Sequence, residues 1–146
     1  MGWGFYNSAG VQKVAGGWTA WTPQVSQNGN KTSTNNSSRY VKIGNFVTAH
    51  CCVTITAAGT SGHAIGVDLP ITNYTATGDI AVGAATFIRI SGPRYQSAAI
   101  LNSTYGTAGS RILFQQAGAT TAMGVDTAFA LASGDYLTFT VSYEAA

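Results

Sequence analysis

Apolar and polar residues alternate along most of this chain with the period of two that is typical of β-strands. The clearest alternation runs from Tyr136 to Tyr143. Its apolar face consists of Leu137, Phe139, Val141 and Tyr143, and its polar face consists of Thr138, Thr140 and Ser142. A Ser133-Gly134-Asp135 turn separates this strand from apolar residues 129–131. The pattern therefore predicts a β-hairpin over residues 129–143.

A second hairpin is predicted over residues 39–56. Residues 46–56 alternate, and residues 39–43 precede them across Gly44-Asn45, a two-residue loop of the kind that closes tight hairpins. The apolar face of residues 46–56 is Val47, Ala49, Cys51, Val53 and Ile55. Further strands are predicted at residues 64–69, 80–84, 87–90, 98–101 and 111–115. Short strands separated by Gly-, Ser- and Thr-rich turns predict an all-β fold, an antiparallel β-sandwich or jelly-roll.

Two segments inside the domain lack this alternation. Residues 28–38 are polar and of low complexity, and we expect them to form a long exposed loop. Residues 115–125 are rich in Ala and Thr and contain two glycines, so they are also predicted to be a loop.

The first sixteen residues differ from the rest because aromatic residues stand among glycines there. These aromatic residues are Trp3, Phe5 and Tyr6. Exposed aromatic side chains usually mark a contact, so we expect residues 1–16 to be an arm that attaches to a neighbouring subunit or a larger assembly. Residues 17–146 would then form the β-domain. The alternative is an ordinary first hairpin that turns at residues 8–10.

The composition fits one domain with few charges. The chain has 146 residues, of which 8% are charged, against roughly 25% in an average protein. Gly, Ser, Thr and Asn fill the difference, which suits a surface that packs against copies of itself or recognises neutral, hydroxyl-rich ligands. The net charge of +2 is spread along the chain, which argues against nucleic-acid binding. We see no signal peptide and no apolar stretch for membrane insertion.

The candidate chemistry points away from metals, cofactors and catalysis. Cys51 and Cys52 are neighbours on a predicted strand, so their side chains point to opposite faces and should not bridge. A ring of three His50 side chains around a trimer axis would be a metal site, but a single strand histidine is far more often an ordinary polar side chain. Catalytic motifs are missing, and most acidic residues adjoin glycines or turns. We therefore expect no enzyme activity, no catalytic residues, no cofactor and no metal.

Aromatic residues are the candidate binding groups. Trp18 and Trp21 should point to opposite faces of an extended chain, so at least one, and in the better interpretation both, belongs to the core. Other candidate ligand contacts fall in or beside turn-rich segments: Tyr74, Arg94, Tyr95 and Tyr105. The alternative is that these tyrosines cover the core at the ends of strands.

Several stretches in a fixed order carry a family resemblance. They are residues 17–23 (GWTAWTP), 39–47 (RYVKIGNFV), Leu69-Pro70, 133–138 (SGDYLT) and 142–146 (SYEAA). This order resembles the β-domain at the C-terminal ends of tail-fibre and minor-tail proteins of tailed bacteriophages, especially those of actinobacteria. The resemblance covers residues 17–146.

The resemblance implies a β-sandwich that forms a homotrimer and has no catalytic residues. It implies a structural protein of the virion, made in the host cytoplasm, associated with the tail tip or fibre and with other virion proteins, and contacting the host surface, where a glycan is one candidate ligand. The family domain usually follows a long fibre, whereas only a short segment precedes it here. Two alternatives therefore stay open: a head (capsid) decoration protein of the same fold, and a freestanding carbohydrate-binding, lectin-like module.

Overall fold

The structure is a computed structural model that describes residues 5–6, 12–13, 17–72, 80–101, 111–125 and 129–146. Within these residues the regular secondary structure consists of β-strands. The strands are β1 (Phe5–Tyr6), β2 (Gln12–Lys13), β3 (Thr19–Ala20), β4 (Val25–Ser26), β5 (Asn30–Lys31), β6 (Ser33–Asn35), β7 (Arg39–Ile43), β8 (Phe46–Ile55), β9 (Gly66–Asp68), β10 (Ile80–Ile88), β11 (Arg94–Leu101), β12 (Arg111–Gln115) and β13 (Tyr136–Glu144). All their pairings are antiparallel. The all-β, antiparallel prediction is therefore confirmed.

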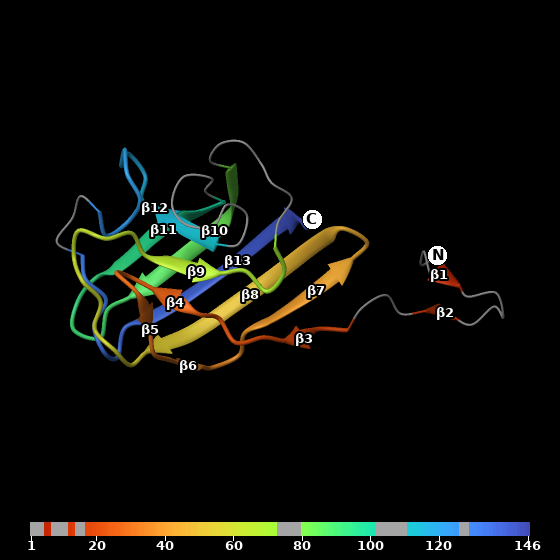
Figure 1. Cartoon of the computed structure of the whole chain (residues 1–146), viewed down its shortest axis with the longest axis horizontal. Helices are drawn as coiled ribbons and strands as arrows, with labels where there is room; N and C mark the ends of the chain where they lie inside the picture. Colours follow the sequence, from red (N-terminus) through yellow and green to blue (C-terminus); the bar gives the residue numbers. More distant parts are fainter. Residues whose placement is uncertain (1–4, 7–11, 14–16, 73–79, 102–110, 126–128) are drawn as a thin grey trace.

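Eleven strands form one sheet in the order β3-β7-β8-β13-β10-β11-β12-β9-β4-β5, and β6 pairs with β8 beside this path. The sheet curls on itself, and residues 30–35 join its two halves (Figure 1). Their first part, β5, pairs with β4, and their second part, β6, pairs with β8. The backbone N–H of Thr56 also donates to the carbonyl of Thr32 at 2.9 Å. Because the described strands form one curled sheet, the sandwich and jelly-roll assignments stay predictions, as does the trimer.

The prediction that residues 28–38 are a loop is wrong in part, because β5 and β6 lie within them. Asn28 and Gly29 take positive φ angles of 54° and 91° and turn the chain from β4 into β5. β6 then pairs with the far end of β8. Thr34 and Asn35 of β6 are polar and exposed. The sequence therefore shows no alternation of apolar and polar residues at this strand.

The core lies inside the curl and follows the predicted faces of the two longest alternating segments. Val47, Ala49, Cys51, Val53 and Ile55 of β8 are buried, as are Leu137, Phe139, Val141 and Tyr143 of β13. β8 and β13 pair along nearly their whole length. Aromatic rings fill the space between the two halves of the sheet: Phe114 on β12 meets Phe87 on β10 at 5.0 Å and Phe139 on β13 at 5.6 Å between ring centroids.

The remaining strand predictions are largely confirmed. The hairpin of β7 and β8 turns at Gly44, where φ is 60°. Residues 80–84 and 87–90, predicted as two strands, belong instead to the single strand β10, which ends at Ile88 and has a register shift between Ala81 and Gly83. Gly83 permits the close approach of β13, since a Cβ at this position would lie 2.0 Å from the carbonyl oxygen of Thr140.

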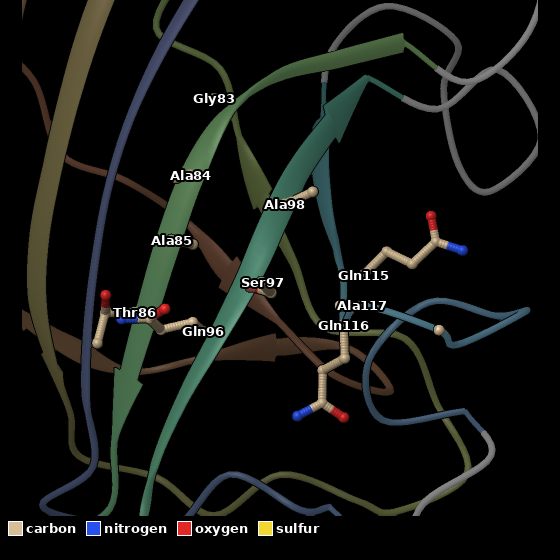
Figure 2. A pocket seen from close by; sticks show the side chains of 11 residues that line it. Gly83, Ala84, Ala85, Thr86, Gln96, Ser97, Ala98, Gln115, Gln116 and Ala117 are labelled. Atoms are coloured by element: carbon tan, nitrogen blue, oxygen red, sulfur yellow. The ribbon is translucent and has the colours of Figure 1, made fainter.

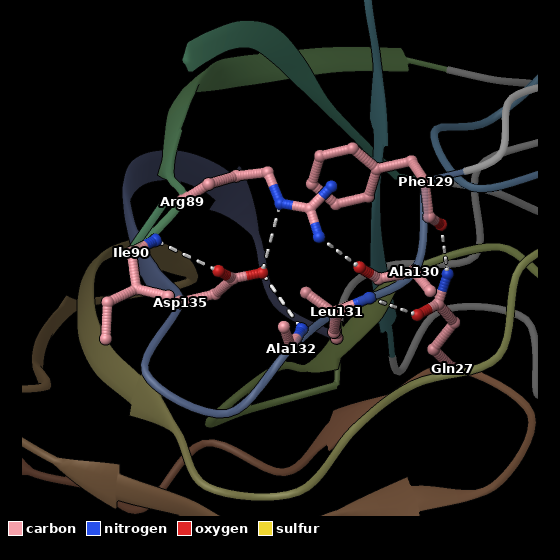
Figure 3. A network of polar contacts seen from close by, with 8 residues as sticks. All are labelled: Gln27, Arg89, Ile90, Phe129, Ala130, Leu131, Ala132 and Asp135. Atoms are coloured by element: carbon pink, nitrogen blue, oxygen red, sulfur yellow. Dashed lines mark hydrogen bonds and ion pairs between the residues drawn. The ribbon is translucent and has the colours of Figure 1, made fainter. Parts of the chain in front are cut away.

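The predicted hairpin over residues 129–143 is wrong in its first half. β13 pairs with β8 and β10, whereas residues 129–132 form no strand. Figure 3 shows the reason: side chains, and not a neighbouring strand, form hydrogen bonds with the backbone N–H and carbonyl groups of this segment. The Gln27 amide bonds to the backbone of Phe129 and Leu131. Arg89 donates to the carbonyl of Ala130 at 3.1 Å, and the Asp135 carboxylate accepts from the N–H of Ala132 at 2.9 Å.

The two N-terminal strands pair with each other and not with the main sheet. β1 pairs with β2, with Phe5 opposite Lys13 and Tyr6 opposite Gln12, and neither joins the eleven-stranded sheet. Both interpretations of residues 1–16, the attachment arm and the first hairpin that turns at residues 8–10, stay predictions, because residues 7–11 lie outside the described residues. Trp3 and the side chains of Phe5 and Tyr6 lie outside the described residues, and the division at residue 17 stays a prediction.

Candidate binding surface on the outer face of the sheet

Side chains that point away from the core form a strip of hydroxyl groups across the middle of the sheet. We call it the hydroxyl strip; it comprises Thr48, His50, Thr86, Thr138, Thr140 and Ser142, which are exposed or half-buried. Two cross-strand hydrogen bonds connect its members, between Thr48 Oγ1 and Ser142 Oγ at 3.0 Å and between His50 Nδ1 and Thr140 Oγ1 at 3.2 Å. No Lys, Arg, Asp or Glu belongs to this strip. Nearly every one of these side chains both donates and accepts hydrogen bonds, and Arg39 stands opposite His50 at the border of the strip.

An open groove of about 680 Å³ continues this face over β10, β11 and β12 (Figure 2). Its floor is made of small residues: Ala84 and Ala98 are exposed, stand opposite each other in the register, and adjoin Gly83. Gln96 extends toward its register partner Thr86 at one side. The other side is formed by Gln115 to Gly118. The groove exists because Ala and Gly occupy positions that larger side chains would fill.

The loop of residues 115–125 builds the far side of the groove. It folds back over the outer face of β11 and β12, where Ala122 packs on Ile100 and Leu113 in a small apolar cluster. The side-chain amide of Gln115 donates to the carbonyl of Ala119 at 2.8 Å and holds the loop in place. The groove lining carries no charged side chain. It therefore suits an uncharged partner surface that offers apolar side chains and a few hydrogen-bonding groups.

Large apolar side chains are exposed at the other side of the same face. This apolar patch consists of Trp18, Ile43 and Phe46, which are 50%, 49% and 55% exposed. Ile43 and Phe46 stand directly opposite each other at the tip of the β7–β8 hairpin. The Arg39 guanidinium lies over the Trp18 ring at 4.8 Å from its centroid. Large exposed apolar side chains often mark contact sites.

The expectation that both tryptophans belong to the core is wrong for Trp18. Trp18 precedes the short strand β3, which runs along the outer edge of β7, so nothing in the described chain covers half of its surface. Trp21 is half-buried and packs against the core, and its indole N–H donates to the carbonyl of His50 at 3.3 Å. The two rings therefore do not form a stacking pair.

Two of the four predicted ligand contacts lie among the described residues, and as strand neighbours their side chains point to opposite faces. Arg94 and Tyr95 begin β11, whereas Tyr74 and Tyr105 lie outside the described residues. Arg94 is exposed. The Tyr95 ring instead packs edge-on against Phe129, 5.0 Å away, at the margin of the core, as in the interpretation in which such tyrosines cover the core. The sequence did not identify the glutamines of the groove as candidate binding residues. Only the run of small residues at 83–85 indicates a strand surface that larger side chains do not fill.

Three side chains of the described chain that could carry reactive chemistry, Cys51, Asp68 and Asp135, are engaged in the structure. Cys51 and Cys52 are both free and buried, and burial raises the pKa of the Cys51 thiol to about 12, so this thiol keeps its proton at neutral pH. Asp68 pairs with Arg111 at 2.8 Å. The buried Asp135 carboxylate accepts hydrogen bonds from backbone N–H groups. The described residues include no cluster of three or more His, Cys, Asp or Glu side chains that would hold a metal ion.

Comparison with protein families, with curated proteins and with solved structures found no match for this chain. In the described part of the chain, no helix is long and apolar enough to cross a membrane.

Proposed function

We propose that this chain is a structural protein of a bacteriophage virion, a tail-tip or fibre-associated β-domain that is displayed on the particle, contacts the host surface and performs no catalysis. The observation that carries the proposal is the wide outer face of the sheet, in which Arg39 and Glu144 border a centre without Lys, Arg, Asp or Glu. There the hydroxyl strip lies between the groove and the apolar patch. A face this wide with apolar ends and a hydrogen-bonding centre is suited to contacts with other proteins.

The placement of Asp135, Cys51 and Asp68 supports the non-catalytic part of the proposal. A general acid or base must reach a substrate, yet Asp135 is 3% exposed and occupied by backbone N–H groups. A nucleophilic cysteine needs a lowered thiol pKa, whereas burial raises that of Cys51 to about 12. Asp68 is engaged by Arg111.

We propose in addition that the domain is a homotrimer with a sandwich-like core. The two halves of the curled sheet face each other across the aromatic contacts of Phe114 with Phe87 and Phe139, which supports the sandwich or jelly-roll assignment. The hydroxyl strip supports self-association, because Thr and Ser side chains pair with their equivalents without leaving a charge buried. Closed symmetric oligomers are the usual result of such contacts.

Immunogold labelling of phage particles tests the location. Antibodies raised against residues 17–146 should label the tail tip or fibre of intact particles from lysates of the host that carries the gene. Label over the capsid would contradict the tail location and support a head decoration protein. If the particles carry no label while the free protein in the same lysate reacts, the virion proposal is wrong.

A further inference from the structure

The turn between β4 and β5 carries the only Asn-Gly pair of the chain, Asn28-Gly29. Both residues are exposed. The side-chain amide of Asn28 and the N–H of Gly29 form no hydrogen bond within the described residues. We propose that Asn28 is a site of spontaneous deamidation, at which the backbone nitrogen of Gly29 attacks the Asn28 side chain and displaces ammonia. This inference does not depend on the virion proposal.

The reaction requires water as its only co-reactant. The Gly29 nitrogen gives up its proton and forms a bond to Asn28 Cγ, while the bond from Cγ to Nδ2 breaks and ammonia leaves with that proton. The product is a five-membered cyclic imide. Water that opens the ring at Cγ leaves an aspartate, whereas water that opens it at the main-chain carbonyl leaves an isoaspartate. In the isoaspartate the main chain runs through the side-chain carbon and is longer by one methylene group.

The residue that follows Asn28 distinguishes it from the other described asparagines. A Cβ at Gly29 would meet nothing within 4 Å, so no neighbour hinders the attacking nitrogen. Glycine also gives the main chain the freedom to bring this nitrogen to the side chain. Asn35 and Asn36 are followed by larger residues, and their side chains are held by hydrogen bonds of 2.7 and 3.0 Å. We therefore expect Asn28 to react first.

Lys31 lies where it favours the reaction. Its Nζ donates a hydrogen bond at 3.4 Å to the backbone carbonyl oxygen of Asn28. This oxygen and the nitrogen of Gly29 belong to the same peptide group. When the nitrogen loses its proton, the negative charge is shared with the oxygen, and a positive charge placed beside a developing negative charge stabilises it. Lys31 should therefore increase the share of the reactive, deprotonated form.

The modification lies at the start of the segment that joins the two halves of the sheet. We call residues 30–35, which contain β5 and β6, the clasp. β5 pairs with β4 at two register positions only. On the other side of Asn28, the buried Gln27 is fixed by its side-chain hydrogen bonds. An extra methylene group in the main chain therefore displaces β5 rather than β4. We expect isoaspartate at position 28 to loosen the clasp, while aspartate leaves the length of the main chain unchanged.

Peptide mapping of protein aged in mildly alkaline buffer tests the site. Chymotrypsin cleaves after Trp21 and Tyr40 and releases residues 22–40, which contain Asn28 and three comparison asparagines, Asn30, Asn35 and Asn36. In the folded protein Asn28 should deamidate several times faster than the other three. A methyltransferase specific for isoaspartyl residues should label this peptide. Equal rates at the four positions, or an intact Asn28 when the others have reacted, would show that the turn is not the site.

Variants of Lys31 test its role separately from the reactivity of the Asn-Gly pair. Lys31→Met keeps a side chain of similar length without a charge, and it should slow deamidation of the folded protein several-fold. Lys31→Arg should restore most of the rate, because the guanidinium also donates to the carbonyl. In urea, where the turn is unfolded, the wild type and Lys31→Met should react at the same rate. A rate in folded Lys31→Met equal to that of the wild type would overturn the role of Lys31.

Trypsin measures the state of the clasp, because it cleaves after Lys31. Aged wild type should be cut there several times faster than fresh protein. Asn28→Gly is the matched control: it cannot deamidate, glycine accepts the φ angle of 54° at this position, and ageing should not change its cleavage. Fresh Asn28→Asp has the charge without the added methylene group, and it should be cut as slowly as fresh wild type. If aged wild type and aged Asn28→Gly are cut equally fast, the modification does not loosen the clasp.

Discussion

The side-chain carbonyl of Gln27 accepts a hydrogen bond at 2.9 Å from the backbone N–H of Leu131, which lies 104 residues further along the chain. The same amide donates to the carbonyl of Phe129 at 2.8 Å and to that of His63 at 3.2 Å. Gln27 is fully buried. One side chain therefore satisfies three backbone groups in two separate loops, and these loops have no strand partner in the described chain.

We predict that Gln27→Leu lowers the free energy of unfolding by about 3 kcal/mol or more. Leucine has a similar size, so the main loss is that of hydrogen bonds, and each buried group left without a partner costs roughly 1–3 kcal/mol. Gln96→Leu is the matched control because Gln96 is exposed; its effect should stay within about 0.5 kcal/mol. Urea unfolding followed by circular dichroism measures both. Equal losses in the two variants would show that the Gln27 network is not a stabilising element.

The same network explains which parts of the fold could be predicted from the sequence. The two faces of β8 and β13 follow from alternation, which is a local property of a strand with one buried side. Residues 129–131 also look like a strand, yet Gln27, Arg89 and Asp135 take their backbone hydrogen bonds. Two of these three side chains are remote in sequence. No local pattern contains that information.

The candidate surface was predictable only in its composition. The low charge of the chain indicated a neutral, hydroxyl-rich face, and the structure places such side chains on β8, β13 and β10. The groove was not predictable, because it depends on the way residues 115–125 fold back over β11 and β12. The exposure of Trp18 depends likewise on its place beside the edge strand β7.

Two buried serines should respond to alanine in opposite directions. Ser97 Oγ is buried without a hydrogen-bond partner among the described residues, so Ser97→Ala should leave stability unchanged or raise it by up to about 1 kcal/mol. Ser38 is buried as well, but its Oγ accepts from the N–H of Cys52 at 3.0 Å. Ser38→Ala should therefore cost about 1–3 kcal/mol. Thermal and urea unfolding measure the difference, and a substantial loss in Ser97→Ala would reveal a partner for its hydroxyl.

Stability should fall in alkaline solution, beginning near pH 9. Burial raises the pKa of the Cys51 thiol from 9.0 to about 12, so the unfolded chain releases this proton at lower pH than the folded protein. The stabilisation is complete below pH 9 and is lost as the pH rises toward 12, at about 1.4 kcal/mol per pH unit.

A cysteine variant separates this effect from that of Tyr143. Burial raises the pKa of the Tyr143 hydroxyl from 10.0 to about 12, so this group destabilises the fold only above pH 10. In Cys51→Ala the decline should begin about one pH unit later than in the wild type. Urea unfolding between pH 7 and pH 11 compares the shapes of the two curves, whatever their levels at neutral pH. An unchanged onset would mean that Cys51 does not govern the alkaline limit.

The last prediction concerns residues 1–16, which we expect to attach the protein to the particle. The described strands of this segment, β1 and β2, pair with each other and not with the eleven-stranded sheet, so the sheet loses no strand when they are removed. Deletion of residues 2–16 should leave a soluble β-domain with a melting temperature within a few degrees of the wild type. It should also keep the wild-type mass, because we propose that residues 17–146 form the self-associating domain.

Incorporation into particles should be lost in the same deletion. Glycines let residues 1–16 follow another protein's surface, and large aromatic side chains are the groups that most often anchor protein contacts. A full-length variant in which Trp3, Phe5 and Tyr6 are all serine is the matched control for chain length, and it should fail to incorporate as well. Complementation of gene-deleted phage, with immunoblots of purified particles, measures incorporation. Unfolding of the deleted protein would make residues 1–16 an integral part of the domain, and normal incorporation would place the attachment site within residues 17–146.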